Sequence, residues 1–563
     1  MKTTFTLIFA IFISGILFAQ VSPNKYWVKF TDKDNSPYSI NNPEEFLSEK
    51  AIQRRAKFEI PLTTSDLPVN PAYIQSVTDL GVTLLNTSKW FNSITIYTTD
   101  PSKIAQIEAL PHVVSVDKSS GNKLKSGDKF EKPFFANETI SGIPETGSLK
   151  KTTAGKSYDY GEGYNQIEML NGIALHDLGY DGAGMTIAVL DAGFLNADDI
   201  SAFDNLWSNG QILGYKDFVN PTNPNLFGSH SHGTMVLSTM GAYLPGQLVG
   251  TAPMADYWLL RSEDGDSETL IEELNWVSAA EFADSVGADI INSSLGYTEF
   301  DDPSQNHTYS DMDGNTTPIT IGADMAVSKG MIVVNSAGNS GGDPWQYIGA
   351  PADGDSVFSI GAVTGSGNYA NFSSTGPTAD GRFKPNVVAQ GQGSALIEPW
   401  GGSVSNGSGT SFSSPITAGM VACLWQANPN ARNTEIMEAI QESATLANNP
   451  NNQLGYGIPD YLEAHLMLPT SIDSETITQR QIVVSPNPFR NEIKLSAGRE
   501  HEKILSITIS DISGRIVYSR KYDTILKANT HIKMNGFSNL REGIYFLTIK
   551  TGNGTVSKKL LKK

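Results

Sequence analysis

The chain has 563 residues, of which 39% are hydrophobic, so it is long enough to fold into several domains with ordinary cores. Its formal net charge of −19 argues against nucleic acid as a partner, because a phosphate backbone would be repelled by most of such a surface. The single cysteine, Cys423, excludes an intrachain disulfide, and its apolar neighbours predict a buried structural thiol.

The first 19 residues are typical of a secretory signal peptide. They contain an early lysine, Lys2, followed by an apolar stretch, and they end in the small residue Ala19, which predicts cleavage before Gln20. No later stretch reaches the roughly 20 continuous apolar residues of a membrane-spanning helix. We therefore expect an exported protein with no transmembrane segment.

Residues 22–118 are predicted to form a small α+β domain. Strand patterns lie at residues 26–30, 82–85, 93–97 and 113–116, and helical patterns at residues 43–55, near residue 73 and at residues 101–110. Residues 119–160 are rich in Lys, Gly, Ser, Thr and Pro, which is the composition of an exposed linker. Because exposed linkers are easily cut, we expect proteolytic cleavage within this segment.

Residues 161–467 alternate apolar strands with helical stretches. The strand-forming sequences are MTIAVLD, YWLL, ADIINSSLG, GMIVVNSAGN and SVFSIGAV. This alternation predicts an α/β fold in which helices cover both faces of a mostly parallel sheet, giving three layers. In such sheets the functional residues collect beyond the carboxyl ends of the strands.

Residues 479–563 are predicted to form a small all-β sandwich. Their hydrophobic and polar residues alternate with a period of two around glycine-containing turns, as in ILSITISDISGRIVY and GIYFLTIKTGNG. This region also has more basic than acidic side chains, the reverse of the rest of the chain. We expect it to bind a partner of its own.

Two residues could activate a nucleophile. Asp191 ends the apolar strand 185–190 and would reach the carboxyl edge of the sheet, although an Asp there could simply cap the next turn. His232 lies in the sequence SHSHGTM, directly before an apolar helical run. A metal site that uses His232 and His230 is disfavoured, because no His-x-x-x-His spacing is present and other ligands are scarce.

The candidate nucleophile is Ser411, in the sequence GTSFSSP. The glycine and threonine before it allow a sharp turn into a helix, which would expose the hydroxyl at the positive end of the helix dipole. Ser413 and Ser414 are expected to satisfy free backbone N–H groups. Asn339 follows the strand 331–334, and its amide would reach beyond the same sheet edge, although Asn is also common in left-handed turns.

Together these residues resemble the subtilisin-like serine peptidases of family S8. The sequences DAGF, HGTM, SSLG, SAGN and GTSFSSP follow one another in that family's order, and Asp, His, Ser is the triad order of subtilisins. The resemblance extends over the α/β region. It implies a secreted serine endopeptidase with a subtilisin-like fold, which hydrolyses peptide bonds of polypeptide substrates through an acyl-enzyme.

The resemblance implies a role for each of these residues. His232 would accept the proton of Ser411 during attack, and Asp191 would orient the imidazole and stabilise the imidazolium. The amide of Asn339 and the backbone N–H of Ser411 would bind the oxyanion. Because the imidazole must be neutral, activity should fall below roughly pH 6 to 7. The residues implied to bind the substrate are Ser294, Leu295, Gly296, Ser336, Ala337 and Gly338.

The sequence departs from the family pattern at four positions. Ala192 replaces a Ser or Thr, Met235 a His, Phe412 a Met and Asn386 an Asp. None of these changes removes an atom of the triad, but Asn386 leaves open whether an ion site lies near it.

The resemblance implies that the chemistry needs no cofactor, and it permits structural calcium. Asp199, Asp311 and Asp313 offer carboxylates for such an ion, although carboxylates in an acidic protein are usually just solvated. No metal ligand is assigned from the sequence.

The flanking regions resemble two other modules. Residues 25–117 resemble the inhibitor-type propeptides of the same family, which occupy the cleft until they are cut. A permanent accessory domain is the alternative. The sequences VVSPNPF, ISDISGRIVY and REGIYFLTI resemble the type IX secretion sorting domains of bacteria, which the transport machinery recognises and which are often removed at the outer membrane. The alternative there is a β-sandwich that binds the cell surface or carbohydrate.

Two other functions compete with the peptidase. Residues 338–342 match the G-x-S-x-G elbow of α/β-hydrolases, with Ser340 as nucleophile, but the only later histidine in the α/β region is His465 and no oxyanion loop motif is present. A non-catalytic binding protein on the same fold would be expected to lack a triad atom, and none is missing. We therefore favour the peptidase.

Overall fold

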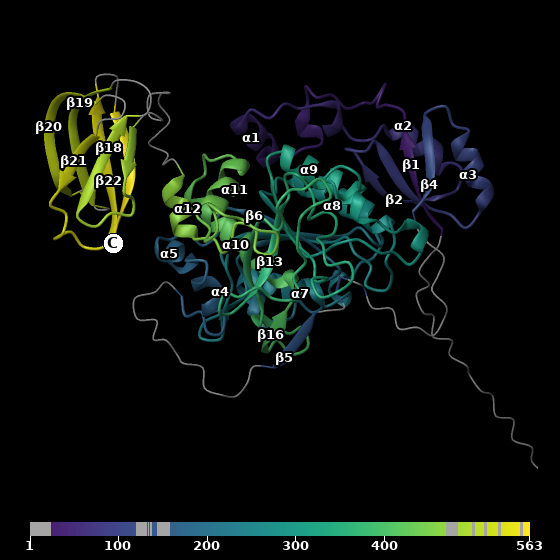
Figure 1. Cartoon of the computed structure of the whole chain (residues 1–563). Coiled ribbons are helices and arrows are strands. Elements are labelled where there is room, and N and C mark those ends of the chain that lie inside the picture. Colours follow the sequence, from purple (N-terminus) through teal and green to yellow (C-terminus); the bar gives the residue numbers. More distant parts are fainter. Residues whose placement is uncertain are drawn as a thin grey trace, which may run out of the picture.

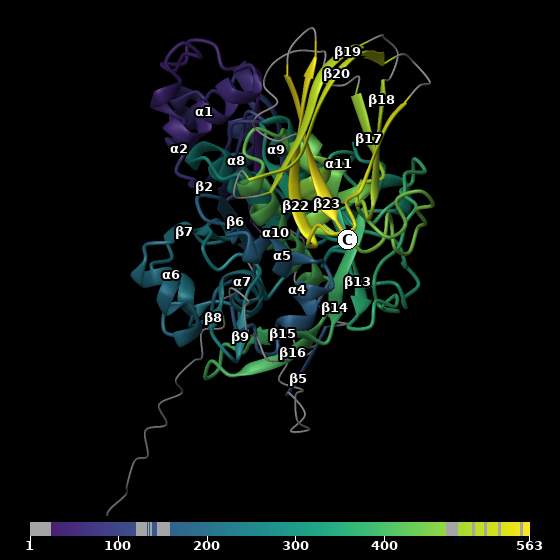
Figure 2. The ribbon, with the colours of Figure 1, turned by 90° about the vertical axis from the view of Figure 1, so that its left-hand side faces the viewer.

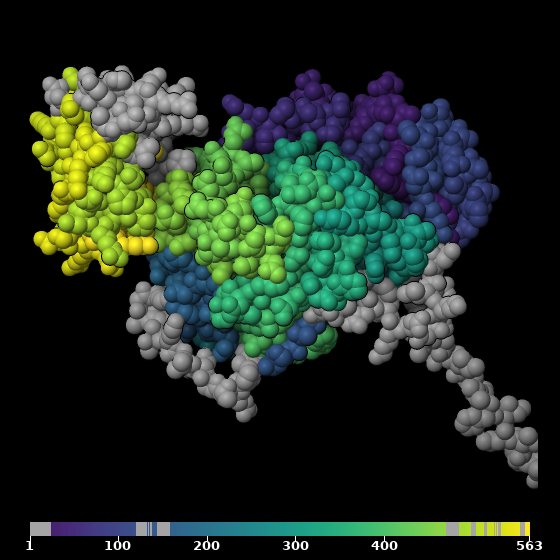
Figure 3. Space-filling view, in the orientation of Figure 1, coloured from purple at the N-terminus to yellow at the C-terminus, as the bar shows by residue number. Residues whose placement is uncertain are grey.

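The computed structural model describes residues 24–119, 132, 134–135, 138–142, 158–468, 482–497, 502–511, 515–526, 531–551 and 555–563. The predicted signal peptide at residues 1–19 lies outside these residues. Figure 1 shows an N-terminal module in purple and blue, a central α/β module, and a C-terminal β module in yellow. The N-terminal module is seated along the teal surface of the central module, and the C-terminal module lies at the opposite end (Figure 3). No helix among the described residues is both long and apolar enough to cross a membrane.

The N-terminal module combines an antiparallel sheet with three helices. Its strands, in the order β2-β3-β1-β4, are β1 (Lys25–Phe30), β2 (Thr83–Ser88), β3 (Ser93–Tyr97) and β4 (Val113–Lys118). Its helices are α1 (Glu49–Phe58), α2 (Pro71–Thr78) and α3 (Pro101–Glu108). Inward-facing apolar residues form its core: Val28, Phe30, Val69, Val77, Val82, Ile94, Ile96 and Ile107. The predicted α+β character is therefore confirmed.

The helix predicted over residues 43–55 is interrupted. Pro43–Glu45 form a single 3-10 turn, and α1 begins only at Glu49. Ser48 caps this helix, because its Oγ accepts a hydrogen bond from the N–H of Ala51 at 3.2 Å. A cap that satisfies a free N–H decides where the helix starts, and the apolar pattern alone did not contain that information.

The central module is built on a seven-stranded parallel sheet, as the alternating pattern predicted. The strands, in the order β14-β13-β12-β11-β6-β10-β7, are β6 (Thr186–Asp191), β7 (Ile212–Asp217), β10 (Asp256–Arg261), β11 (Ile290–Ser293), β12 (Ile332–Ser336), β13 (Phe358–Thr364) and β14 (Val387–Gln392). The two edge strands, β7 and β14, were not predicted. Edge strands need less continuous apolar sequence, and β7 is half exposed.

Helices cover both faces of this sheet. Above it in Figure 1, on the side of the N-terminal module, lie α8 (Ile271–Val286) and α9 (Pro318–Ser328). The helices α7 (His232–Gly241) and α10 (Thr410–Ala427) pack against each other, and α10 also contacts β11 to β14. Smaller helices complete the module: α4 (Tyr164–Glu168), α5 (Gly172–Asp177), α6 (Asp204–Ser208), α11 (Asn433–Glu442) and α12 (Tyr461–Met467). Cys423 is buried in α10, as predicted.

The segment 119–160 is not an exposed linker throughout. Its described part contains β5 (Thr139–Gly142), which pairs antiparallel with β16 (Val404–Ser408) along the lower edge of the molecule in Figures 1 and 2. The strand β15 (Ser394–Ile397) lies on the other side of β16. Lys132 is buried in the central module. Lys132 thus departs from the expected exposure, whereas all four residues of β5 are exposed. Composition does not reveal that a polar segment has a complementary surface to bind.

The C-terminal module is a sandwich of two antiparallel sheets, as the period-two pattern predicted. One sheet contains β17 (Ile482–Ser485), β18 (Glu492–Ala497) and β21 (His531–Asn535). The other contains β19 (Glu502–Asp511), β20 (Ile516–Leu526), β22 (Gly543–Thr551) and β23 (Thr555–Lys562). Thirteen buried apolar residues, from Phe489 to Leu560, form a core that is separate from that of the central module.

Candidate active site

The predicted site residues gather where three neighbouring strands of the parallel sheet end. Asp191 is the last residue of β6, residues 294–296 follow β11, and residues 337–339 follow β12. Two helices begin at the same edge, α7 at His232 and α10 at Thr410, which precedes Ser411. Parallel strands present all their carboxyl ends at one edge, so residues far apart in sequence meet there.

Asp191 and His232 contact each other directly. The Nδ1 atom of His232 lies 2.8 Å from Asp191 Oδ1, and the N–H of Ala192 donates to the same oxygen at 2.7 Å. Both side chains are buried. Gly233 permits this approach of α7, because a Cβ at that position would lie 2.4 Å from the carbonyl oxygen of Gly193. The carboxylate therefore fixes the tautomer of the ring, with the proton on Nδ1.

Asn339 and Ser411 are joined through Thr410. The Oδ1 atom of Asn339 accepts hydrogen bonds from the N–H (2.8 Å) and the hydroxyl (2.9 Å) of Thr410. On the other side, the hydroxyl of Ser294 donates to the carbonyl oxygen of Ser411 at 2.9 Å. These contacts fix the orientation of the Asn339 amide and of the first turn of α10.

The hydroxyl of Ser411 is buried and makes no hydrogen bond to any residue that the structure describes. The ring of the next residue, Phe412, lies 6.2 Å from the ring of His232, so the first turn of α10 lies near the imidazole. The hydrogen bond that the triad prediction requires between Ser411 and His232 is not formed, however, because the outer nitrogen of the imidazole faces another group.

That group belongs to the chain's own segment 132–142, which crosses the site. The carboxylate of Glu138 lies 3.2 Å from His232 Nε2, and its other oxygen accepts from the amide of Asn339 at 3.4 Å. The same amide donates to the carbonyl oxygen of Phe134 at 3.0 Å. The ring of Phe135 lies over His232, with 4.3 Å between ring centroids. Sequence analysis missed these contacts, since no local pattern marks a segment that binds elsewhere on its own chain.

The two carboxylates change the titration of His232. Burial alone would lower its pKa, but the charges of Asp191 and Glu138 raise the pKa to about 10. The imidazole is therefore protonated at neutral pH while Glu138 is in contact. A protonated imidazole cannot accept a further proton.

Two of the predicted substrate-binding residues, Gly296 and Gly338, lie against the ring of Phe134. A Cβ at Gly296 would lie 2.6 Å from its ring, and a Cβ at Gly338 would lie 3.9 Å away. Ser294, Leu295, Ser336 and Ala337 are buried beside these glycines in sequence. The two glycines therefore leave room for an aromatic ring in this pocket.

The elbow around Ser340 is not formed as α/β-hydrolases require. Residues 341–345 are turns and bends where that fold needs a helix. His465 lies in α12, where its ring contacts Asn428 at 2.9 Å and Lys559 at 2.5 Å. His465, the histidine that the α/β-hydrolase alternative would use, therefore binds other residues.

Other predicted polar residues serve local structure. Asp311 accepts the N–H of Thr308, and Asp313 accepts the N–H of Asn315, so both carboxylates close turns, whereas Asp199 is exposed. Within the described residues, no three His, Cys, Asp or Glu side chains are grouped as a metal site.

Asn386 likewise has a structural role. Its amide oxygen accepts from the N–H of Ser359 at 2.9 Å and from the ammonium of Lys384 at 3.0 Å. A cation of the protein itself therefore already occupies this position, which disfavours an ion beside Asn386.

The N-terminal module docks on α8 through Glu281. This buried carboxyl accepts three hydrogen bonds from the turn between β2 and β3: from the hydroxyl of Ser88 (2.5 Å) and from the N–H groups of Lys89 (2.7 Å) and Trp90 (3.0 Å). Burial raises the pKa of Glu281 to about 7, although these bonds and the nearby Lys89 oppose the shift. The module is therefore held against the central module by its own turn.

Buried ion pairs reinforce this docking. Asp284, one turn further along α8, lies 2.7 Å from Arg54, 2.8 Å from Arg55 and 3.1 Å from Lys89. Burial of Asp284 is outweighed by these cations, which hold its pKa well below the usual range. Removing one of these partners would leave a buried charge without compensation, which is strongly destabilising. The interface is therefore stable only when these charged residues meet.

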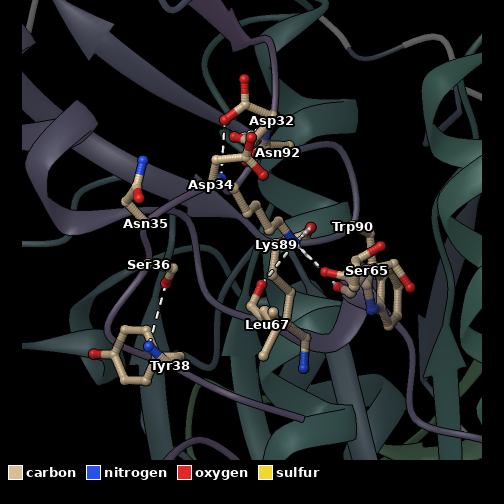
Figure 4. Close-up of a pocket in the computed structure, with 12 residues that line it drawn as sticks. Asp32, Asp34, Asn35, Ser36, Tyr38, Ser65, Leu67, Lys89, Trp90 and Asn92 are labelled. Carbon is tan, nitrogen blue, oxygen red and sulfur yellow. Dashed lines mark hydrogen bonds between the residues drawn. The ribbon is translucent and has the colours of Figure 1, made fainter.

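A pocket of about 550 Å³ lies in the N-terminal module, next to the docking turn. Figure 4 shows Leu67 and Lys89 among the residues that line it. The ammonium of Lys33 donates to the carbonyl oxygens of Leu67 and Lys89 (both 2.6 Å) and of Thr64 (2.8 Å). This lysine joins the loops of the module, and the pocket contains none of the predicted site residues.

The fold and the site define a hydrolase of the serine type on a parallel α/β sheet, and comparison with known proteins specifies the class. The subtilase family matches residues 182–457. A Bacteroidota peptidase S8 propeptide domain matches residues 25–132, and a secretion system C-terminal sorting domain matches residues 483–563. These matches confirm the two flanking resemblances, and the sorting domain indicates export to the cell surface or beyond.

Two subtilisins agree with this assignment. Subtilisin of Bacillus pumilus is 30% identical over 283 residues, which cover 50% of this chain and 90% of the relative. Subtilisin E of Bacillus subtilis (strain 168) is 31% identical over 287 residues, and the chain spans 66% of its length. MycP1 from Mycobacterium smegmatis, a solved structure, is 19% identical with a TM-score of 0.44 and covers 59% of this chain and 89% of its own. The chain belongs to the subtilase family of serine peptidases.

Proposed function

We propose that the protein is a secreted serine endopeptidase that hydrolyses polypeptide substrates through an acyl-enzyme. Ser411 attacks the carbonyl carbon, His232 takes its proton, and Asp191 orients the imidazole and stabilises its charged form. Asn339 and the backbone N–H of Ser411 bind the oxyanion. The observation that carries the proposal is the 3.0 Å hydrogen bond from the Asn339 amide to the carbonyl oxygen of Phe134, beside the joined Asp191 and His232.

The N-terminal module acts as an inhibitory propeptide in this proposal. Its docking on α8 carries the segment 132–142 into the site, where Glu138 and Phe135 cover His232. Cleavage within the segment 119–160 and departure of the module then open the site to substrates. The C-terminal module serves as the address that the secretion machinery binds.

Metal ions have no part in the chemical steps of this proposal. Catalysis uses side chains and backbone N–H groups only, and calcium, where bound, stabilises the fold. A chelator would therefore lower the melting temperature of the processed enzyme before it lowered kcat at room temperature.

The test is labelling and turnover by the processed enzyme. A fluorophosphonate should modify Ser411, and Ser411→Ala should abolish both labelling and peptide hydrolysis. Ser340→Ala is the matched control and should retain most activity. Turnover should also fall as the pH drops through the pKa of His232 once Glu138 has left. Loss of activity with Ser340→Ala but not with Ser411→Ala would instead favour an esterase-type site.

A further inference from the structure

A buried acidic pocket lies next to the proposed active site. Its carboxylates belong to Glu263, Glu268 and Glu272, in the loop after β10 and the first turn of α8, and all three side chains are buried. The hydroxyl of Tyr297 donates to Glu263. Glu272 accepts the N–H of Thr269 at 2.7 Å. Among the described residues, the carboxylate of Glu268 has no hydrogen-bond donor other than the ammonium of Lys132, with which it forms an ion pair.

The occupant of the pocket is a lysine side chain. The ammonium of Lys132 lies 2.6 Å from Glu272 Oε2 and 3.2 Å from Glu268 Oε2, and it also pairs with Glu263. The side chain of Lys132 is 1% exposed. Three carboxylates therefore surround one cation. Burial, together with the charge of Glu263, raises the pKa of Glu268 to about 8 even though Lys132 opposes the shift, so one cation does not fully compensate the three carboxyl groups.

One short segment of the chain connects the acidic pocket to the proposed catalytic residues. Phe134, two residues after Lys132, has its carbonyl oxygen on the amide of Asn339 and its ring beside Gly296. Phe135 covers the imidazole of His232. The carbonyl oxygen of the Phe134–Phe135 peptide bond therefore lies on the proposed oxyanion donor Asn339, with a cation pocket two residues upstream.

We propose that the pocket of Glu263, Glu268 and Glu272 is a substrate subsite for a Lys or Arg side chain two residues before the aromatic residue after which the enzyme cuts. This inference rests on the proposed peptidase function. The Phe134–Phe135 bond of the chain itself is the first substrate of this class. The pocket is made only of residues downstream of that bond, so it stays with the processed enzyme and is free to bind other polypeptides after Lys132 has left.

The proposed cleavage is an ordinary acyl transfer in two steps. The Oγ atom of Ser411 bonds to the carbonyl carbon of Phe134 while the bond to the nitrogen of Phe135 breaks. The serine proton passes through His232 to that leaving nitrogen. A water molecule then attacks the ester, which releases Phe134 as a free carboxylate and restores the hydroxyl.

The experiment uses the processed enzyme and quenched peptides with the sequence of residues 128–137, DKFEKPFFAN, which end before Glu138. The position of Lys132 is varied to Arg, Gln or Glu, and mass spectrometry locates the cut bond. We expect cleavage between the two phenylalanines and a kcat/KM about tenfold or more higher for Lys or Arg than for Gln, because a charge-assisted bond to a buried partner is lost. The Glu peptide should be the poorest substrate. Edman sequencing of the processed enzyme should begin at Phe135.

Variants separate a subsite from a structural cluster. In the double variant Glu268→Gln/Glu272→Gln the ratio of kcat/KM for the Lys and Gln peptides should fall to near one. A purely structural defect would lower both rates together and leave the ratio unchanged. Glu299→Gln, an exposed glutamate outside the pocket, should retain the ratio of the wild type. Fluorophosphonate titration gives the concentration of folded enzyme in each case.

The outcomes distinguish this inference from the function on which it rests. Equal cleavage of the Lys, Gln and Glu peptides, or cleavage at another bond, would overturn the subsite and leave the peptidase intact. Failure to cut any peptide, together with failure to label Ser411, would remove the proposed function itself.

Discussion

The ring of His232 lies between two carboxylates, one on each nitrogen. Asp191 holds Nδ1, as expected of a triad, whereas Glu138 faces Nε2, the position from which the imidazole would take the serine proton. The two negative charges stabilise the imidazolium and outweigh the burial that disfavours it. In the proposed mechanism, the segment would thus cover the imidazole and also keep it in the protonated state.

Glu138→Gln should accelerate self-processing of the intact chain near pH 7 to 8. The substitution removes one of the two charges that raise the pKa of His232 to about 10, so the neutral imidazole becomes available at lower pH. Each unit by which this pKa falls gives about tenfold more neutral imidazole in that range. Gel electrophoresis after refolding by dilution would follow the loss of intact chain at several pH values.

Glu299→Gln serves as the matched control for this prediction, because Glu299 is exposed. Its processing should have the pH profile of the wild type, with a rising limb at more alkaline pH than that of Glu138→Gln. Identical profiles for all three chains from pH 6 to 10 would show that Glu138 does not control the base.

The individual site residues were predictable where the signal is local. Asp191, Asn339 and Ser411 each directly follow an apolar strand or precede an apolar helix, so the rules for parallel sheets placed them at one edge. Glu138 and Lys132 were not predictable, because their roles depend on a surface formed by residues more distant in sequence. Ser413 and Ser414 were predicted to satisfy N–H groups, yet their hydroxyls donate, to the carbonyl of Thr410 and to Asn292.

At the scale of the element, α8 joins the N-terminal module to the active site. Its first turn supplies Glu272 of the acidic pocket, and its last turns supply Glu281 and Asp284 of the docking surface. One rigid helix therefore contacts both the body of the module and the segment that leaves it. Because α8 contacts both the N-terminal module and the segment that follows it, the helix buries acidic residues in its first turn and in its last turns.

The docking of the N-terminal module should weaken as pH rises because of Glu281. The pKa of Glu281 is about 7 when docked and should return towards the usual glutamate value of 4.5 when the turn leaves. The docked state then holds more protons, so this group favours docking as pH falls through 7 and opposes it above. With processed enzyme blocked by a fluorophosphonate, size-exclusion chromatography should find more dissociation at pH 8 than at pH 5.5.

Glu281→Gln is the matched test of that contribution. The amide oxygen can still accept the hydrogen bonds of Ser88 and Trp90, which share one carboxyl oxygen in the wild type, whereas the bond from the N–H of Lys89 to the other oxygen is lost. The amide cannot titrate, so the difference in dissociation between pH 5.5 and pH 8 should shrink. A full pH difference in the variant would assign the effect to other groups.

At the scale of the whole molecule, the C-terminal module contacts the central module through a buried lysine. Lys559 of β23 lies against His465 of α12, with 2.5 Å between the nitrogens, and donates to the carbonyl of the same histidine at 3.1 Å. Burial lowers the pKa of Lys559 to about 7, and burial with the nearby lysine lowers that of His465 to about 3. Both groups therefore pack best without charge.

Acidification should loosen this contact. The packed state holds fewer protons on Lys559 than the separated state, so packing is favoured as pH rises and is lost as pH falls through 7. Small-angle scattering of the Ser411→Ala chain should find a larger radius of gyration at pH 6 than at pH 8.5. Lys559→Met should remove the difference, while Lys558→Met, which alters a half-buried neighbour, should preserve it.

The modules were predictable from the sequence, but their arrangement was not. Hydrophobic periodicity distinguishes an α+β, an α/β and an all-β region because each pattern depends on neighbours along the chain. The contacts of Arg54 and Arg55 with Asp284 join residues from different modules. Contacts between modules produce no periodic pattern in the sequence, so the docking of the N-terminal module could be found only from the structure.

The pairing of β5 with β16 has a consequence for the timing of activity. A cut before Phe135 leaves Glu138 and β5 covalently attached to the enzyme, so they remain intramolecular ligands of His232 and of β16. Dilution does not reduce the effective concentration of a ligand on the same chain. Activity would thus be delayed after the first cleavage, and the delay would not depend on the protein concentration. The delay would end only when the new amino terminus is trimmed or displaced.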